Sequence, residues 1–239
     1  MAATALRLGE TRIELVRKDI KHVHLTVHPP AGRVRMTAPR HLSDDALRAF
    51  AIARLGWIRR QQTKLREQER ETRRALVDRE THYVLGRRVL LKVIEADASP
   101  RIELSPQRLT LRVRPGTPAR RKAALLEEWY RAQLREALPP VVAKWERRVR
   151  VKVRHVFIQR MKTRWGSSNP RAGTIRLNTE LARKPLQCLD YLVAHEVAHL
   201  REPRHGARFV ELMDSLLPSW RSIRQTLNRL PVRHEDWGL

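Results

Sequence analysis

The sequence predicts an α+β fold, in which N-terminal antiparallel β-hairpins and a helix precede a β-rich segment and a helix that packs beside a small sheet. Short stretches of alternating apolar and polar residues, typical of strands, are bounded by Gly and Pro turn signals. Longer stretches place apolar residues at helical spacing. Hydrophobic residues make up 41% of the 239-residue chain, which is enough to build a packed core.

The predicted domain covers residues 12–232, with tails at residues 1–11 and 233–239. Within it, residues 12–75 form the N-terminal hairpin and helix. Residues 81–232 hold the β-rich segment and the core that carries the residues of chemical interest. No internal repeat is evident in the sequence.

The N-terminal part predicts a hairpin followed by a helix. "HVHLTVHP" alternates apolar and polar residues, and Pro and Gly separate it from the next strand segment, "GRVRMTAP". Ser43 is a favoured N-cap, and Asp44 and Asp45 suit the first turn of a helix. The polar residues from about residue 66 to residue 80 are interpreted as a solvated helix end and a linker.

The second β-rich part comprises "HYVLGRRVLLKVIEA", "RIELS" and "RLTLRVRPG". Thr117 as N-cap and Pro118 as first helical residue predict the start of a long amphipathic helix. Pro139 and Pro140 are expected to kink or split that helix, because proline lacks the amide hydrogen.

The C-terminal part predicts two more strands, "VKVRHVFIQ" and "TIRLN", and then helices. Pro185 is expected in the first turn of the next helix, and Pro203 interrupts the chain after it. A further helix is predicted from about His205 to Leu217, and a last short one begins near Pro218.

The chain is strongly basic, with 50 Lys and Arg against 25 Asp and Glu and a formal net charge of +25. Arginine pairs with phosphate in a bidentate way, so nucleic acid is one candidate partner. The alternative is a solvated basic surface without a specific partner, because the basic residues are spread along the whole chain instead of forming one tract.

A single cysteine, Cys188, excludes an internal disulfide framework and suits a reducing compartment. The N-terminus has no apolar run of signal-peptide length, and no stretch approaches the roughly 18–20 uninterrupted apolar residues of a membrane span. A cytoplasmic protein without a membrane partner is therefore expected.

The stretch "YLVAHEVAHLREPRHGARF" predicts a zinc site. His195 and His199 are four residues apart, so both imidazoles project from one face of a helix and can reach one ion. His205, just beyond the helix-breaking "REP", supplies a third ligand. The flanking residues are apolar, and buried imidazoles without partners are costly. The alternative is a set of core histidines that other protein groups satisfy.

Glu196 is offset from His195 by about 100° around the helix, so it points beside the ion. There it can take a proton from a zinc-bound water. Three protein ligands with one open position are typical of catalytic zinc. The sequence thus predicts a zinc-dependent hydrolase, with Glu196 as its catalytic carboxylate.

The spacing of the three histidines also matches the metzincins, which have Gly three residues after the second His and a Met-turn. Here Glu202 occupies the position of that Gly, and Met213 falls in a predicted helix. These two differences disfavour a metzincin.

Several segments, in order, resemble the YgjP-like metallopeptidase family, which is related to the SprT-like zinc proteases. The most specific are "MKTRWGSSNPRAGTIRLNTELARKP" and "DYLVAHEVAHLREPRHGARF". "LTVHPPAGRVRMTAPRHLSDDALRAFAIARLGWIRRQ" and "YVLGRRVLLKV" resemble the family more loosely. Two positions depart from the family's pattern, since Ser168 replaces a Cys and Val210 replaces a Trp.

The resemblance implies a zincin-like catalytic part whose metal ligands are His195, His199 and His205 and whose catalytic carboxylate is Glu196. It also places the segment around Arg164 close to the metal helix.

Three residues outside the histidine motif are candidates for substrate binding. Arg164 and Trp165 could line a substrate cleft, and an edge strand beside them could pair with an extended peptide. Asn178 could orient a loop or a ligand. The alternative interpretation is structural, with Trp165 in the core, Arg164 at the surface and Asn178 supporting the backbone.

A metallopeptidase acting on peptides or unfolded proteins is the main functional hypothesis. One alternative is a nucleoside triphosphate pyrophosphatase or other phosphoanhydride hydrolase, which would use the same metal site and the cations Arg160, Lys162 and Arg164. The other is a nucleic-acid-associated basic protein, for which Glu196 beside an open metal site would have no purpose.

Overall fold

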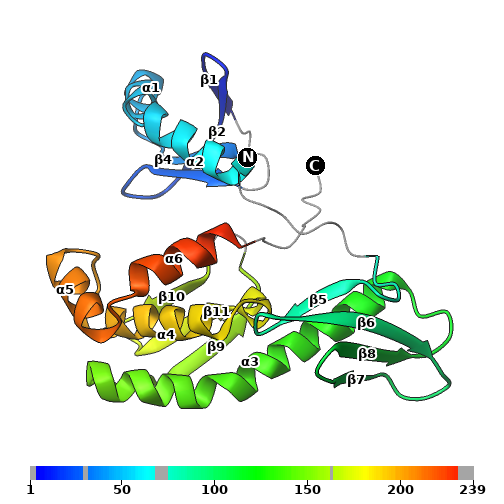
Figure 1. The fold of residues 1–239 in the computed structure, drawn as a ribbon. Coiled ribbons are helices and arrows are strands. Elements are labelled where there is room, and N and C mark those ends of the chain that lie inside the picture. Colours follow the sequence, from blue (N-terminus) through cyan, green and yellow to red (C-terminus); the bar gives the residue numbers. More distant parts are fainter. Residues whose placement is uncertain (1–3, 29–31, 68–74, 162–163, 231–239) are drawn as a thin grey trace. The chain divides into compact units, whose positions relative to one another are not determined.

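The computed structural model describes residues 4–28, 32–67, 75–161 and 164–230. Residues 1–69 belong to one compact unit and residues 70–234 to another. Both units combine sheets with helices, so the predicted α+β class is confirmed (Figure 1).

The part of the first unit that the structure describes is a four-stranded sheet with two helices. The strand order is β1-β2-β4-β3, in which β1 and β3 are antiparallel to their neighbours and β2 is parallel to β4. Its elements are β1 (Thr4–Leu8), β2 (Thr11–Lys18), β3 (His24–His28), β4 (Arg33–Pro39), α1 (Asp44–Ala53) and α2 (Leu55–Glu67). The predicted hairpin of β3 and β4 is present, but its turn at residues 29–31 lies outside the described residues.

The core of the first unit lies between one face of the sheet and the helices. Ile13, Val34 and Met36 from the strands pack with Leu47 and Ile58 from the helices, and all five are fully or almost fully buried. The predicted N-cap is confirmed, since the Ser43 hydroxyl accepts a hydrogen bond from the Ala46 amide at 3.3 Å.

Two predictions for the first unit need correction. Residues 1–11 were predicted as a tail, but Thr4–Leu8 is strand β1, which pairs with β2. One helix was predicted after Ser43, but the chain forms two, because Arg54 leaves the helical conformation and its amide bonds to carbonyls of the preceding turn.

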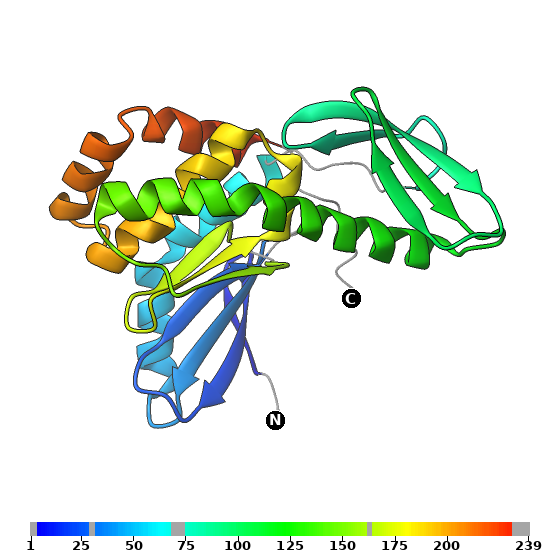
Figure 2. The same cartoon turned by 90° about the horizontal axis from the view of Figure 1, so that it is seen from below.

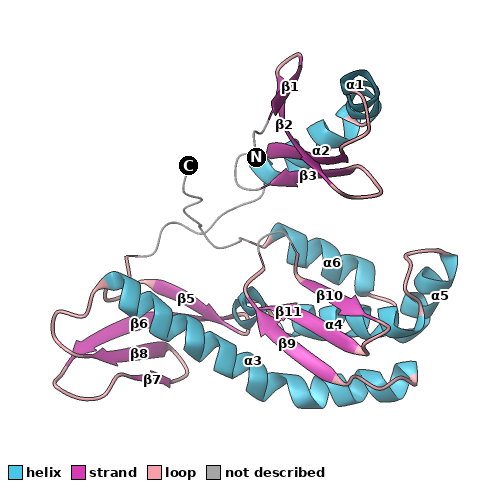
Figure 3. Ribbon diagram, turned by 180° about the vertical axis from the view of Figure 1, so that it is seen from behind, coloured by secondary structure: helices cyan, strands magenta, loops and turns pink. Residues whose placement is uncertain are grey.

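In its described residues, the second unit has two sheets, four α-helices and one short 3-10 helix. One sheet has the order β5-β6-β8-β7, and the other has the order β10-β11-β9 (Figure 3). Its elements are β5 (Thr81–Val84), β6 (Arg87–Glu95), β7 (Arg101–Leu104), β8 (Arg108–Val113), α3 (Ala119–Val149), β9 (His155–Gln159), β10 (Gly166–Asn169), β11 (Thr174–Asn178), the 3-10 helix η1 (Thr179–Arg183), α4 (Leu186–Arg201), α5 (Ala207–Leu216) and α6 (Trp220–Arg229).

The two four-stranded sheets have the same topology. In each, an antiparallel hairpin joins the first two strands, the second strand is parallel to the fourth, and the third is antiparallel to the fourth. A helix follows the last strand of each, α1 in the first unit and α3 in the second. The chain therefore contains an internal repeat of structure, which its sequence did not reveal.

Helix α3 runs without a break through Pro139 and Pro140, so the predicted splitting is wrong. Both prolines lie on the exposed side of the helix. The carbonyls that lose their amide partners belong to Arg135 and Glu136, which are also exposed, so water can supply the missing hydrogen bonds. The start of α3 also differs, because Pro118 is the N-cap and the Thr117 hydroxyl donates to the Arg114 carbonyl at 2.6 Å.

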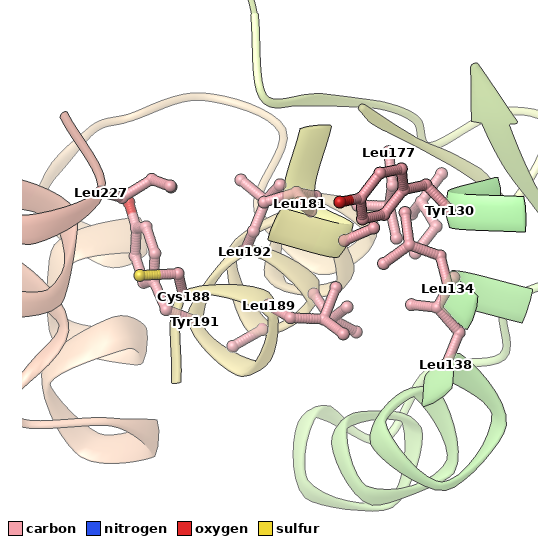
Figure 4. Close-up of a cluster of buried hydrophobic side chains, with 14 of the residues drawn as sticks. Tyr130, Leu134, Leu138, Leu177, Leu181, Cys188, Leu189, Tyr191, Leu192 and Leu227 are labelled. Carbon is pink, nitrogen blue, oxygen red and sulfur yellow. The ribbon is translucent and has the colours of Figure 1, made fainter. Parts of the chain in front are cut away.

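Helix α4 lies at the centre of the second unit and is buried on most of its surface. Figure 4 shows Tyr130, Leu134 and Leu138 of α3 on one side of it and Leu227 of α6 on the other. Asp190 ties α4 to α3, since its carboxylate accepts hydrogen bonds from the Lys144 ammonium and the Trp145 indole. The position of α4 is thus fixed from both sides.

The β5–β6 turn docks against the start of α4. The Leu85 amide donates to the Ala182 carbonyl at 2.7 Å, and Gly86 packs against Pro185, the N-cap of α4. A Cβ on Gly86 would lie 2.7 Å from the Pro185 Cα, so no other residue fits there without displacement. The β5–β8 sheet therefore supports the N-terminal end of α4.

Figure 2 shows α3 as the longest helix of the molecule. Its surface is rich in charged residues, and none of the described helices has the length and apolar character needed to cross a membrane.

We predict that Gly86→Ala destabilises the protein more than Gly116→Ala. Both glycines have positive φ, 82° and 72°, so each substitution costs about 1 kcal/mol in backbone strain. Only Gly86 meets a neighbour, which adds about 1–3 kcal/mol of overpacking. Chemical denaturation followed by circular dichroism measures both losses, and equal losses would show that the Pro185 contact does not matter.

Candidate metal centre

Three imidazole nitrogens converge at the C-terminal part of α4. The Nε2 atoms of His199 and His205 lie 3.0 Å apart, and those of His205 and His195 lie 3.2 Å apart. Nitrogens bound at about 2.05 Å to a tetrahedral zinc lie about 3.3 Å from each other. The residues present therefore fit a zinc ion, and all three predicted ligands are brought together.

The three histidines meet because α4 ends two residues after His199. His195 and His199 lie one turn apart on α4, which ends at Arg201. The Glu202 amide caps the end by donating to the Ala198 carbonyl at 2.8 Å. The short connection to α5, which begins at Ala207, then returns His205 to the same face.

The imidazole of His199 is oriented by the backbone. Its Nδ1 lies 3.0 Å from the Glu202 carbonyl oxygen. A carbonyl can only accept a hydrogen bond, so Nδ1 carries the proton and Nε2 is left with its lone pair for a metal. The ring also stacks on Phe209 of α5, with 4.4 Å between centroids, which restricts its rotation.

His195 is held by packing and has a buried nitrogen without a partner. Its ring lies 5.8 Å from Tyr191 and 5.0 Å from Phe209. Among the described residues, its Nδ1 has no hydrogen-bond partner. Burying a polar atom without a hydrogen-bond partner costs free energy. Binding of a metal at Nε2 would help to offset that cost.

Burial keeps the two α4 imidazoles neutral. Desolvation, followed by the neighbouring histidines His199 and His205 and by Arg224, lowers the pKa of His195 to about 3. Desolvation is also the main cause that lowers the pKa of His199, against the opposing hydrogen bond to Glu202. Neutral imidazole is the form that binds a metal, so the site is prepared for an ion at neutral pH.

Glu196 is buried beside the histidines and lies against strand β10. Its side chain is 5% exposed, and burial raises its pKa to about 7, although the Ser168 hydroxyl and the charge of Arg164 act to lower it. A Cβ on Gly166 would lie 2.7 Å from the Glu196 Oε1, so the carboxylate occupies the space that a larger residue would need. Gly166 and Ser168 thus position Glu196 from β10.

Strand β10 and the residues on it are not predicted by the sequence pattern. The four residues of the strand, "GSSN", are small and polar and show no alternation of apolar and polar side chains, so the segment reads as a connection between strands. Ser168, which replaces the Cys of the family's pattern, hydrogen-bonds to Glu196. A glycine that directly follows a tryptophan and precedes two serines is a signal of close backbone approach that could have pointed to this contact.

The three predicted substrate residues lie near Glu196 but differ in what they contact. Arg164 is exposed, and its charge acts on Glu196. Trp165 is half-buried and packs against the main core, in part as the structural interpretation expected. Asn178 is buried, and its amide nitrogen donates to the carbonyls of Met161 and Arg164 at 2.8 Å each. Asn178 therefore holds the backbone at Met161 and at Arg164.

Other polar groups on α4 serve the packing of the helix. Cys188 is fully buried, and desolvation raises the pKa of its thiol to about 11, which disfavours the thiolate form needed for metal binding. Asp190 is bonded to Lys144 and Trp145 on α3. Lys162, the middle member of the predicted cation group, lies outside the described residues.

A family model described as the YgjP-like metallopeptidase domain matches residues 21–230. The chain belongs to the YgjP-like metallopeptidase family. The match includes the whole segment that carries the three histidines and Glu196, together with β10. A search of curated proteins gave no match.

Two solved structures are similar to part of this YgjP-like chain. One is the metallopeptidase zymogen of Pyrococcus abyssi abylysin, with 18% identity, a TM-score of 0.35, and coverage of 37% of this chain and 89% of that one. The other is the metallopeptidase zymogen of Methanocaldococcus jannaschii jannalysin, with 19% identity, a TM-score of 0.34, and coverage of 37% and 90%.

We predict that the purified protein binds close to one zinc ion per chain and that His199→Ala loses most of it. Removing one of three ligands weakens the site strongly, whereas Glu196→Gln keeps all three imidazoles and should retain the metal. Elemental analysis after dialysis measures the zinc content. Wild-type protein that holds no zinc after reconstitution would contradict the site.

We also predict that Gly166→Ala retains zinc but loses about 10²-fold in hydrolytic activity, because the new Cβ displaces the Glu196 carboxylate. Gly206→Ala is the matched control, since Gly206 adjoins His205 and a Cβ there meets nothing within 4 Å. Zinc content and activity are measured on both variants. Activity that stays normal in Gly166→Ala would argue against the role assigned to the contact.

Proposed function

We propose that this protein is a zinc-dependent peptidase in which Glu196 acts as general base on the attacking water. The observation that carries the proposal is the placement of one buried carboxylate beside three converging imidazoles, with Gly166 leaving room for it. When bound, zinc would lower the pKa of a water molecule and polarise the carbonyl of the substrate.

The environment of Glu196 suits a group that takes up and releases a proton. Its pKa of about 7 results from burial, and a cation held by the three histidines would favour the carboxylate form that a base requires. Gly166 leaves the space that the carboxylate fills, and the Ser168 hydroxyl donates a hydrogen bond that holds it there.

Strand β10 offers an extended peptide a place to bind. Within the described residues, β10 has a single strand neighbour, β11, so no described strand pairs with its other edge, which we call the open edge. The Asn178 amide donates to the Trp165 carbonyl, which makes that pair hydrogen-bonded across the two strands. Hydrogen-bonded and non-hydrogen-bonded pairs alternate along antiparallel strands. Gly166 and Ser168 are therefore in non-hydrogen-bonded pairs, and their backbone amides and carbonyls point away from β11, to the open edge. An added peptide strand would run directly past Glu196.

Arg164 can contribute to electrostatic stabilisation near the reacting carbonyl. It is exposed, and its backbone carbonyl accepts a hydrogen bond from the Asn178 side chain at 2.8 Å. Negative charge that develops on the substrate oxygen would be favoured by a nearby guanidinium.

Phosphoanhydride hydrolysis would need several cations close to the metal. The grouping of Arg160, Lys162 and Arg164 stays a prediction, because Lys162 lies outside the described residues. The open edge of β10 favours a peptide instead. The cytoplasmic location, too, stays a prediction that rests on the sequence.

We predict that the protein cleaves an unfolded protein substrate and that Glu196→Gln lowers the rate by about 10²–10⁴-fold, as expected for the loss of a general base. Glu211→Gln is the matched control, because Glu211 is an exposed glutamate on α5. Wild type and both variants are assayed side by side on unfolded protein and on nucleoside triphosphates. Phosphate release that depends on Glu196, without peptide cleavage, would overturn the proposal.

A further inference from the structure

The β5–β8 sheet has one face in the core and one face in solvent. Leu91, Leu109 and Leu111 point inward and pack with Tyr130 and Leu134 of α3. Side chains alternate along a strand, so the cross-strand register defines the opposite side. We name it the outer face, and it consists of Thr81, Tyr83, Arg88, Leu90, Lys92, Ile94, Arg101, Glu103, Arg108, Thr110 and Arg112.

The outer face is strongly basic. It carries five cations and a single acid, Glu103, which pairs with Arg101 at 3.0 Å. Lys92 pairs with Asp78 at 2.6 Å. The other three cations have no carboxylate within ion-pairing distance in the described part of the chain, and they are Arg88, Arg108 and Arg112. This face therefore attracts anions.

Two exposed apolar side chains lie among these cations. Tyr83 is 41% exposed and Leu90 is 38% exposed. Tyr83 is directly opposite Arg88, and Leu90 is directly opposite Arg108. Neighbouring strands lie about 4.8 Å apart and alternate residues about 6.7 Å apart, so the face extends over about 20 Å along β6. It could hold several nucleotides.

We propose that the outer face of the β5–β8 sheet binds single-stranded nucleic acid. Arg88, Arg108 and Arg112 contact phosphates, and Tyr83 stacks on a base. Arginine forms bidentate hydrogen bonds with phosphate. An exposed aromatic ring beside cations is the combination that single-strand-binding surfaces use.

Other anionic partners fit this face less well. Duplex DNA admits a helix or a two-stranded ribbon into its major groove, and a four-stranded sheet is too wide to enter it. The bases of a duplex are also stacked on each other and are closed to Tyr83. An acidic polypeptide would use the cations but would gain nothing specific from an aromatic ring beside them.

The repeated sheet of the first unit offers an internal comparison. Its solvent-facing side also carries five cations and one acid, namely Arg7, Arg12, Lys18, Arg33, Arg35 and Glu14. It has no Tyr, Phe or Trp among its described residues. The two sheets thus share a charge pattern, but the second carries a tyrosine ring, whereas the first carries the imidazoles of His24 and His28.

The test is the binding of a fluorescent oligothymidylate of about 16 nucleotides, measured by anisotropy at several salt concentrations. For a single strand, log K falls with log salt by about 0.7 for each phosphate contacted. The triple variant Arg88→Gln, Arg108→Gln, Arg112→Gln is expected to bind at least 10-fold more weakly and to have a slope less steep by about 2.

The matched control removes three exposed arginines from the helices of the first unit, by Arg48→Gln, Arg59→Gln and Arg66→Gln. It loses the same charge and is expected to bind nearly as wild type does. Tyr83→Leu is expected to weaken binding by about 5- to 150-fold, the value of one base–aromatic stack, and Tyr83→Phe should bind normally. His199→Ala should also bind normally, so the result does not depend on the proposed peptidase activity.

Three outcomes would overturn the proposal. The first is no binding by wild type at low salt. The second is an equal loss in the control and in the triple variant, which would mean attraction to the whole basic surface. The third is equal binding of duplex DNA or polyglutamate with no effect of Tyr83→Leu, which would assign the face to anions in general. Wild type alone decides the first outcome, so the test does not depend on every variant folding.

Discussion

The contact between Glu196 and Gly166 is the constraint on which the rest of the site depends. It joins α4, the helix that carries His195 and His199, to strand β10 so closely that no side chain fits at position 166. Because the position of α4 is also fixed by α3, by α6 and by the β5–β6 turn, the contact holds Glu196 in a single place. His195 and His199, on the same helix, are then positioned relative to Glu196 by helix geometry alone.

Burial gives these groups their chemical character. The same desolvation that lowers the pKa of His195 and His199 raises that of Glu196, so the imidazoles are neutral and the carboxyl group titrates near neutrality. In a solvent-exposed helix with the same sequence, none of these shifts would occur. The apolar packing around α4 therefore prepares the metal centre as well as stabilising the fold.

The sequence was sufficient for features that depend on local spacing. The i, i+4 pair of His195 and His199, the return of His205 after the helix end, and the Ser43 cap follow from short-range geometry. Features set by tertiary contacts were not predictable. The prolines of α3 are tolerated because they lie on the exposed side, β10 is defined by its pairing with β11, and the repeat of the two sheets appears only in strand order.

The central claim is that three imidazole nitrogens hold one zinc ion and leave a position for water. Zinc K-edge X-ray absorption on the reconstituted protein tests it directly. The account predicts three nitrogen ligands at about 2.0–2.1 Å, one oxygen ligand, and no sulfur at about 2.3 Å. A sulfur ligand would implicate Cys188, and six light-atom ligands would indicate a surface-bound ion. Either result would contradict the site described here.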